Sequence, residues 1–357
     1  MTIHLRPVQF VDTPVGRDGE VARLAGGMQW FAAYELSEGG RKRTISVAEF
    51  ERTIWAEDER AAALHRAITA ARPALRLGGR TLRFDQPQVA AILNVTPDSF
   101  SDGGAHADGP AGAASSAVGA GVAMAAAGAA LVDVGGESTR PGAATVWEED
   151  EARRVVPVIE RLVAAGTLVS VDTRKAAVME AAIAAGAAIV NDVSALIWDD
   201  RALATVAKAG CPVVLMHSPD PAKGPHGGSG YRDVLTEVFD WLEARVAAVA
   251  AGGVDRARII VDPGIGFGKS LADNLALLNG LAIFHGLGCP VMLGASRKRL
   301  IGALSNEAPV EARLGGSVAL ALLGAQAGVQ LLRVHDVAET VQAVRVWRGL
   351  RDRALVG

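Results

Sequence analysis

The chain has 357 residues, half of them hydrophobic, and 36 Lys and Arg against 39 Asp and Glu give a formal net charge of −3. This length allows one large domain or two ordinary ones, and the balanced charge excludes a general binder of nucleic acid or anionic membranes. Because no apolar run approaches the roughly 20 residues of a membrane span and the charged N-terminus lacks a signal-peptide core, we expect a cytoplasmic protein.

The first 85 residues show no regular alternation of strands and helices. They contain a charged turn at 37–43 and a predicted helix at 57–72. We expect an N-terminal region at 1–85, made of a few strands and this helix, that packs on the rest of the chain. The charged turn is best interpreted as a solvated loop, and the sequence does not indicate what the region does.

From about Val89 onward, short runs rich in Val, Ile and Leu alternate with longer amphipathic stretches rich in Ala and Leu. Continuous apolar strands are typical of a parallel sheet that is covered on both faces. Strands are predicted at 89–96, 130–139, 168–173, 188–193, 212–217, 259–264, 290–296 and 331–336. Helices are predicted at 150–165, 175–186, 199–209, 232–251, 271–286, 310–327 and 337–350.

Eight such units, each about 34 residues long, match the size and number of units in a TIM barrel. We therefore predict an α/β fold, a (β/α)₈ TIM barrel at 86–357 with an appended N-terminal region. An open doubly wound sheet is the alternative, but eight units in a row with no further domain favour a closed barrel.

Every predicted strand ends in at least one polar residue that could bind a ligand. A TIM barrel forms its active site at the C-terminal ends of its strands. One or two polar residues there would mean little, but eight strands in eight indicate an assembled site. The residues are Asn94, Glu137 with Thr139 and Arg140, Asp172, Asn191 with Asp192, His217, Asp262, Ser296 with Arg297 and Lys298, and Arg333 with His335.

The acidic and amide groups indicate one part of a ligand. Asp172, Asn191 and Asp262 follow apolar strands, and buried carboxylates are costly unless they are paired or hydrogen-bonded. A flat heterocycle with an amino-amidine edge would satisfy them, since a carboxylate matches two parallel N–H donors.

The basic groups indicate another part. Arg140, Lys298, Arg333 and His335 supply positive charge suited to an anionic leaving group such as a phosphate. Asn94 offers a neutral oxygen ligand for Mg²⁺. The Gly-rich segments match neither a P-loop nor a dinucleotide fingerprint, so we expect no dinucleotide cofactor.

At these strand ends the sequence resembles the dihydropteroate synthases, which are pterin-binding TIM barrels. The resemblance covers about 90–350 and rests on "ILNVTPDSFSDGG" (92–104), "DVGGESTRPGA" (133–143), "SVDTRK" (170–175), "VNDVSAL" (190–196), "LMH" (215–217), "DPGIGFGKS" (262–270), "SRKRLIG" (296–302) and "RVHDVAET" (333–340). It implies condensation of a dihydropterin pyrophosphate with 4-aminobenzoate, assisted by Mg²⁺, in a homodimer that is inhibited by sulfonamides.

The resemblance also implies a role for individual residues. The catalytic residues would be Asp172, Arg140 and Lys298. The pterin ring would be held by Asp172, Asn191, Asp262 and Lys298. The pyrophosphate would be bound by Arg333, His335 and Arg140, with Asn94 on Mg²⁺. The 4-aminobenzoate pocket would be shaped by Thr139, Pro141, Phe267 and Ser296.

The sequence does not decide the role of every polar residue near the predicted site. His217 and Glu137 could contact the substrate or only support the structure. The Gly- and Pro-rich segment after His217 departs from the relatives' usual sequence, so its contact with the pterin is in doubt. We interpret Arg174 and Lys175, at a predicted helix start, as solvated residues outside the site.

Two alternative functions compete with the synthase activity. A pterin-barrel methyltransferase acting on methyltetrahydrofolate would share the acidic residues but would not need the "SRK" and "RVHDV" segments. A catalytically silent paralogue that only binds a pterin is disfavoured by the intact Asn94, Arg140, Asp172, Lys298 and His335.

Overall fold

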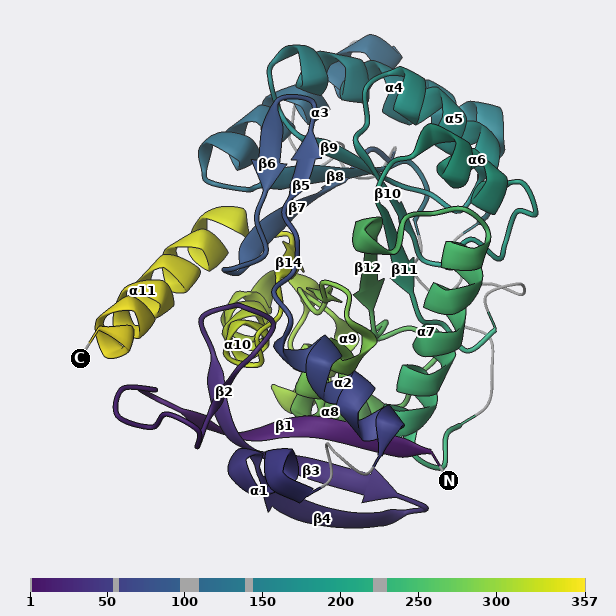
Figure 1. Cartoon of the computed structure of the whole chain (residues 1–357). Coiled ribbons are helices and arrows are strands. Elements are labelled where there is room, and N and C mark those ends of the chain that lie inside the picture. The colour runs from purple at the N-terminus through teal and green to yellow at the C-terminus, as the bar shows by residue number, and fades with distance from the viewer. Residues whose placement is uncertain (1, 54–57, 97–108, 139–143, 221–229, 357) are drawn as a thin grey trace.

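The computed structural model describes residues 2–53, 58–96, 109–138, 144–220 and 230–356 of the chain. The predicted barrel is confirmed, with all eight strands close to their expected positions (Figure 1). They are β7 (Gln88–Asn94), β8 (Leu131–Gly135), β9 (Val169–Asp172), β10 (Ile189–Asp192), β11 (Val213–Met216), β12 (Ile259–Asp262), β13 (Met292–Leu293) and β14 (Leu331–Val334).

The sheet is closed. Its hydrogen-bonded order is β12-β11-β10-β9-β8-β7-β14-β13, and all the pairings are parallel. A parallel bridge between Val261 and Val291 joins the two ends of this order. The open doubly wound alternative is therefore excluded, and the carboxyl ends of all eight strands lie around one mouth.

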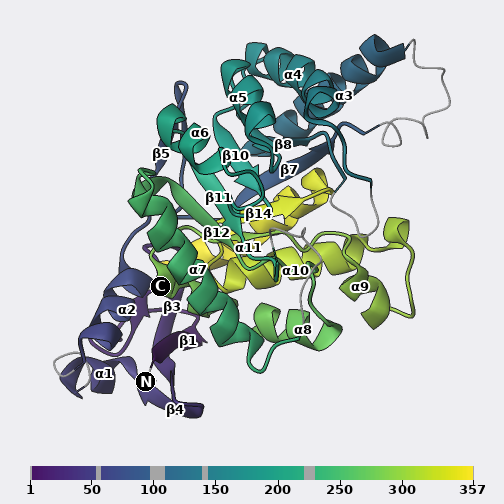
Figure 2. The same ribbon diagram turned by 90° about the vertical axis from the view of Figure 1, so that its right-hand side faces the viewer.

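Helices surround the barrel (Figures 1 and 2). They are α3 (Gly109–Ala126), α4 (Glu148–Ala164), α5 (Ala176–Ala184), α6 (Ala202–Ala209), α7 (Val234–Ala251), α8 (Leu271–Asn279), α9 (Arg299–Leu304), α10 (Leu314–Gln326) and α11 (Val337–Leu355). The predicted 271–286 helix is α8 followed by a 3₁₀ segment, η3 (Leu281–Leu287). The sequence did not predict α3, because its run of Gly, Ala and Ser shows no clear alternation of apolar and polar faces.

The N-terminal end of the barrel is closed by a hairpin, β5 (Leu75–Leu77) and β6 (Arg80–Leu82). Leu75, Leu77, Leu82 and Phe84 form one buried cluster with one residue from each barrel strand except β9, to which Leu168, directly before that strand, corresponds. Since inward side chains recur every second residue, the next inward layer toward the carboxyl ends holds the polar residues. Figure 2 shows the hairpin and α9 at opposite ends of the molecule.

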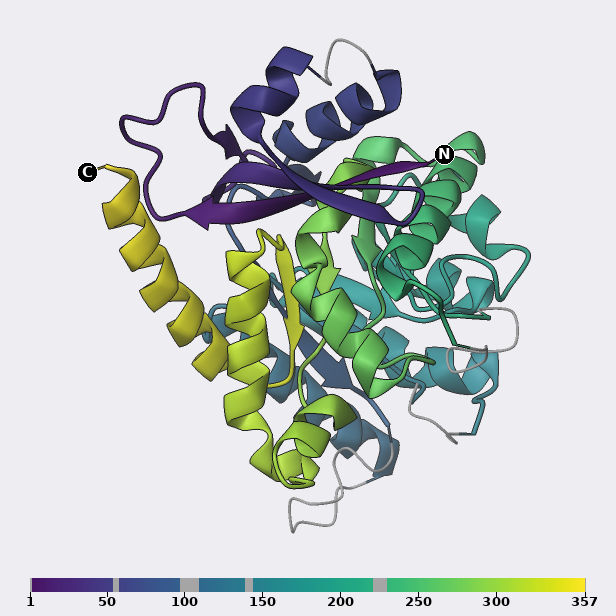
Figure 3. The same ribbon diagram turned by 90° about the horizontal axis from the view of Figure 1, so that it is seen from below.

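The rest of the N-terminal region lies on the outside of the barrel, as predicted (Figure 3). β1 (Ile3–Val11), β2 (Ala22–Arg23), β3 (Trp30–Glu38) and β4 (Arg41–Ser46) form an antiparallel sheet, with α1 (Val47–Thr53) and α2 (Glu59–Thr69) beside it. Arg60 on α2 forms a bidentate pair with Glu243 on α7, at 2.6 and 2.8 Å. The proposed boundary at residue 85 stays a prediction.

Within the described ranges, no helix is both long enough and apolar enough to cross a membrane.

Candidate active site

The guanidinium of Arg333, on β14, lies between two carboxylates inside the barrel. Its Nε donates to Oδ2 of Asp133 on β8 at 2.6 Å, and its Nη2 donates to Oδ2 of Asp172 on β9 at 2.5 Å. Asp133 also accepts hydrogen bonds from Ser170 Oγ at 2.5 Å and from Asn191 Nδ2 at 2.9 Å. The network thus joins four strands and brings Asp172, Asn191 and Arg333 together, as the sequence predicted.

Besides Ser170, the member of this network that the sequence reasoning missed is Asp133. It is 2% exposed and lies in the middle of β8, not at its end. The available signal was a single carboxylate within an otherwise apolar strand, which must find a partner because an unpaired buried charge is costly. Arg333 therefore pairs with two carboxylates here, and its assigned role toward pyrophosphate stays a prediction.

Asp262 and Lys298 lie on the same side of the mouth. Asp262 Oδ1 accepts a hydrogen bond from the Gly264 N–H at 2.7 Å. The ammonium of Lys298 donates to the Ile265 carbonyl and lies 4.3 Å from the centre of the Phe267 ring, a cation–π contact. Predicted pterin-binding residues therefore converge with a residue assigned to the 4-aminobenzoate pocket.

Burial controls the charges of these groups. Desolvation lowers the pKa of Lys298 to about 8, although the carboxylates of Asp262 and Asp172 oppose this shift. Desolvation likewise raises the pKa of Asp262, against the nearby positive charges of Lys298 and Arg333. A Cβ added to Gly294 would lie 3.6 Å from Oδ2 of Asp262 and 4.0 Å from Cβ of Arg333, so these two side chains border one space. Shifted pKa values of this kind are typical of functional sites.

Three further predicted residues lie at the same strand ends. Ser296 Oγ accepts from the backbone N–H of His335 at 3.2 Å and lies 3.2 Å from its ring Nδ1. Asn94 Oδ1 lies next to Gly135, where an added Cβ would be 3.7 Å from this oxygen and 3.5 Å from Cβ of Asp172. The glycine therefore leaves open the space between Asn94 and Asp172. Thr139, Arg140 and Pro141 lie outside the described residues.

The donor set suits a metal ion held mainly by its substrate. Among the described residues there is no group of three or more His, Cys, Asp or Glu that could hold a metal. Mg²⁺ keeps several waters and is usually bound by one or two protein oxygens together with phosphate oxygens. The single amide oxygen of Asn94 at the rim fits that form of binding.

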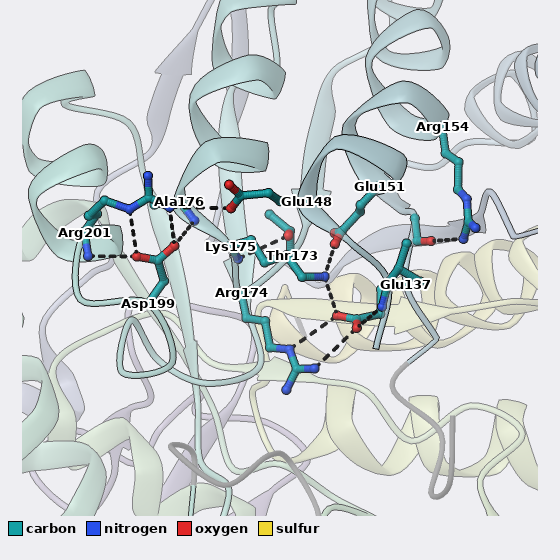
Figure 4. Close-up of polar contacts among 12 residues, drawn as sticks. Glu137, Glu148, Glu151, Arg154, Thr173, Arg174, Lys175, Ala176, Asp199 and Arg201 are labelled. Carbon is teal, nitrogen blue, oxygen red and sulfur yellow. Dashed lines mark hydrogen bonds and ion pairs between the residues drawn. The ribbon is translucent and has the colours of Figure 1, made fainter. Parts of the chain in front are cut away.

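Glu137, which follows β8, forms ion pairs with Arg174 and Lys175, which follow β9 (Figure 4). Its carboxylate lies 3.0 Å from Lys175 Nζ and 3.3 Å from Arg174 Nε, and it accepts from the Val146 N–H at 3.1 Å. Lys175 also pairs with the fully buried Glu151 on α4. Glu137 therefore has a structural role in a cluster of two carboxylates and two basic side chains, and a contact with the substrate stays a prediction.

The interpretation of Arg174 and Lys175 as solvated residues is wrong. Their side chains are only 11% and 8% exposed. The Arg174 guanidinium also stacks on the Trp198 ring, at 3.8 Å from its centre. Their partners come from the preceding βα unit, which local sequence reasoning does not place beside them.

His217 packs as a core residue. Its ring contacts Trp241 edge-on, with ring centres 5.0 Å apart, and is 3% exposed. Desolvation, reinforced by the charge of Lys269, lowers the pKa of His217 to about 2, so the ring is neutral. The backbone carbonyl of His217 accepts a hydrogen bond from Lys269, which follows the loop after β12.

Known proteins resemble this chain in sequence and in fold. A family model described as "Pterin binding enzyme" matches residues 90–335. The dihydropteroate synthase of Escherichia coli strain K12 is 44% identical over 269 residues, which are 75% of this chain and 93% of the relative.

Solved structures match in the same way. Xanthomonas albilineans dihydropteroate synthase with 4-aminobenzoic acid is 51% identical, has a TM-score of 0.73 and covers 79% of this chain and 99% of its own. The same enzyme in complex with 7,8-dihydropteroate is 49% identical, with a TM-score of 0.70, over 78% and 99%. Yersinia pestis dihydropteroate synthase in a sulfonamide drug complex is 42% identical, with a TM-score of 0.72, over 79% and 100%.

Proposed function

The chain belongs to the pterin-binding enzyme family, and from this membership and its site we infer a dihydropteroate synthase activity. As a transferase of folate biosynthesis, it condenses 6-hydroxymethyl-7,8-dihydropterin pyrophosphate with 4-aminobenzoate to give 7,8-dihydropteroate and pyrophosphate. The observation that carries this conclusion is the convergence of Asp172, Asn191, Asp262, Lys298 and Arg333 on one mouth.

We propose that the pterin ring is held by groups of opposite kinds. The Asp262 carboxylate would accept hydrogen bonds from the 2-amino group and N3, and Asn191 and Lys298 would contact other polar atoms of the ring. Phe267 and Ser296 would border the 4-aminobenzoate pocket together with Thr139 and Pro141. The support is the shared position of the described members at the barrel mouth.

The chemistry then depends on charge. Departure of pyrophosphate leaves a cation that is delocalised from the methylene carbon into the pterin ring, and Asp172 would stabilise it as a nearby anion. Arg140, Arg333 and His335 would bind the leaving pyrophosphate. Mg²⁺, when bound beside Asn94, would offset the phosphate charge. The neutral aromatic amine attacks the methylene, so neither a strong base nor a covalent enzyme intermediate is required.

The family resemblance also implies an oligomeric state. We propose that the enzyme is a homodimer, which sedimentation equilibrium would test directly. Its cytoplasmic location stays a prediction from the sequence.

The activity is tested by mixing the protein with dihydropterin pyrophosphate, 4-aminobenzoate and Mg²⁺. We expect equimolar release of pyrophosphate and 7,8-dihydropteroate, loss of turnover when EDTA removes the metal, and its recovery when Mg²⁺ is restored. A sulfonamide should inhibit competitively with 4-aminobenzoate. Pterin binding without pyrophosphate release would instead identify a silent paralogue, and methyl transfer from methyltetrahydrofolate to a corrinoid would identify a methyltransferase.

A further inference from the structure

Lys269 is a cation beside this site to which the proposed reaction gives no role. It directly follows the loop 263–268, which connects it to β12. Its ammonium points back toward the backbone of that loop. Three backbone carbonyls surround the ammonium, those of Gly264 at 2.8 Å, Phe267 at 3.2 Å and His217 at 3.3 Å. Because an ammonium has three N–H donors, each carbonyl can receive one of them.

The loop has few other means of holding its shape. Gly264, Gly266 and Gly268 have positive φ values of 69°, 82° and 56°, so the backbone turns through conformations that other residues rarely adopt. Besides the Lys269 contacts, the loop is held by hydrogen bonds from the Gly266 N–H to Asn274 Oδ1 at 2.6 Å, from the Gly264 N–H to Asp262 Oδ1 and from Lys298 to the Ile265 carbonyl. Within the loop, the Phe267 N–H donates to the Gly264 carbonyl at 3.2 Å. Lys269 therefore supplies the contacts that join the loop to a neighbouring strand end.

The contact with that strand end is very close. A Cβ added to Gly264 would lie only 1.9 Å from the His217 carbonyl oxygen, which follows β11. The carbonyl oxygens of Gly264 and His217 thus lie near each other, and their partial negative charges repel. A cation between them offsets this repulsion, whereas an apolar side chain would take the ammonium away from both and leave the Gly264 carbonyl with the Phe267 N–H at 3.2 Å.

The position of the loop determines the position of the pterin-binding groups. Asp262 immediately precedes it, and the Ile265 carbonyl accepts a hydrogen bond from Lys298. The Phe267 ring lies beside the same ammonium, and a Cβ added to Gly266 would be 2.8 Å from Cδ of Lys298. A shift of the loop away from β11 would therefore displace Lys298 and Phe267 together.

We propose that Lys269 is a positioning residue, whose ammonium fixes the 263–268 loop to the end of β11 and so holds Asp262, Phe267 and Lys298 in their pterin-binding arrangement. This role rests on the proposed function and deepens it. Desolvation, together with the like charge of Lys298, lowers the pKa of Lys269 to about 7 against the attraction of Asp262 and Asp273. Burial therefore disfavours the charged form of Lys269, and the three carbonyl acceptors around its ammonium favour that form.

The test is the variant Lys269→Met, which keeps the length of the side chain but removes its charge and donors. Its dissociation constant for dihydropterin pyrophosphate, measured by calorimetry without 4-aminobenzoate, should rise about tenfold or more, as expected for loss of hydrogen bonds to a charged group. Ser270→Ala is the matched control, because it removes the exposed capping box of α8 next to the loop. It should lower the melting temperature by several degrees and leave pterin affinity unchanged.

A second pair of variants addresses the same contact from the other side. Gly264→Ala inserts a methyl group against the His217 carbonyl and should also weaken pterin binding. The double variant with Lys269→Met should bind no more weakly than the worse single variant, since both changes release the same contact. If Lys269→Met does not fold, Lys269→Gln, which keeps two N–H donors without the charge, replaces it with a smaller expected loss.

The outcomes are distinguishable. Unchanged pterin affinity in the Lys269 variant, with an active wild type, would overturn the positioning role and leave the proposed function intact. Failure of the wild type to bind the pterin substrate at all would instead contradict the proposed function.

Discussion

Asp172→Asn is expected to lower kcat by a factor on the order of 10² to 10³, the range observed when one electrostatic contact to a transition state is removed. The substitution removes the anion that we place beside the developing cation and keeps its volume. The protein should stay folded, because Arg333 retains its contact with Asp133 at 2.6 Å and the amide can still accept from its Nη2. Single-turnover kinetics with saturating substrates would measure the effect.

The pH profile supplies a matched control. Desolvation raises the pKa of Asp172 to about 7, against the attraction of Arg333. Turnover of the wild type should therefore fall as the pH is lowered through 7, whereas Asp172→Asn should lack this acidic limb.

The raised pKa of Asp172 affects the stability of the fold in the opposite direction. Since the folded pKa exceeds the unfolded value of about 3.9, this group's contribution to stability is complete below pH 4 and is lost as the pH rises through 7. Equal turnover and equal profiles in both proteins would exclude Asp172 as the stabilising anion.

Truncation of the chain to begin at Gln86 is expected to abolish soluble expression. The deleted part contains the β5–β6 hairpin, whose Leu75, Leu77, Leu82 and Phe84 close the barrel from below. Without the hairpin, the barrel residues that it covers would face water. Each large apolar side chain exposed in this way costs roughly 1.5–3 kcal/mol. Several such residues together would exceed the 5–15 kcal/mol stability of an ordinary domain. Solubility and circular dichroism would report the loss.

The informative control is a chain that begins at Ala74 and keeps the hairpin. It loses the outer sheet and α2 but leaves the barrel interior closed. The Xanthomonas structures span 99% of their own chain while covering at most 79% of this one, so barrels of this family fold without such an extension. We expect this shorter chain to fold and bind the pterin substrate. A soluble, active chain beginning at Gln86 would show that the hairpin is dispensable.

The barrel could be predicted because its strands are continuous apolar runs with regular spacing, and burial on both faces requires such runs. The helix α3 could not, because small side chains give little contrast between its faces. The hairpin was assigned to the N-terminal region, although its buried residues belong to the barrel interior. The sequence of the hairpin does not indicate that it packs against the N-terminal end of the barrel.

The candidate site could be predicted as a set of residues but not as a set of contacts. The polar strand ends identified Asp172, Asn191 and Asp262, since parallel strands bring their carboxyl ends together. The pairing of Arg333 with Asp133 and Asp172 joins residues 200 and 161 positions apart, and no local pattern encodes it. The burial of Lys175 was missed for the same reason, because Glu137 and Glu151 reach it from another unit.

A crystal structure of the chain with 7,8-dihydropteroate tests the arrangement of the site most directly. We predict that the pterin ring lies in the barrel mouth, with Asp262 accepting hydrogen bonds from the 2-amino group and N3, and with Asn191 and Lys298 in contact with the ring. A pterin bound elsewhere, or a ring edge that makes no contact with Asp262, would contradict the account.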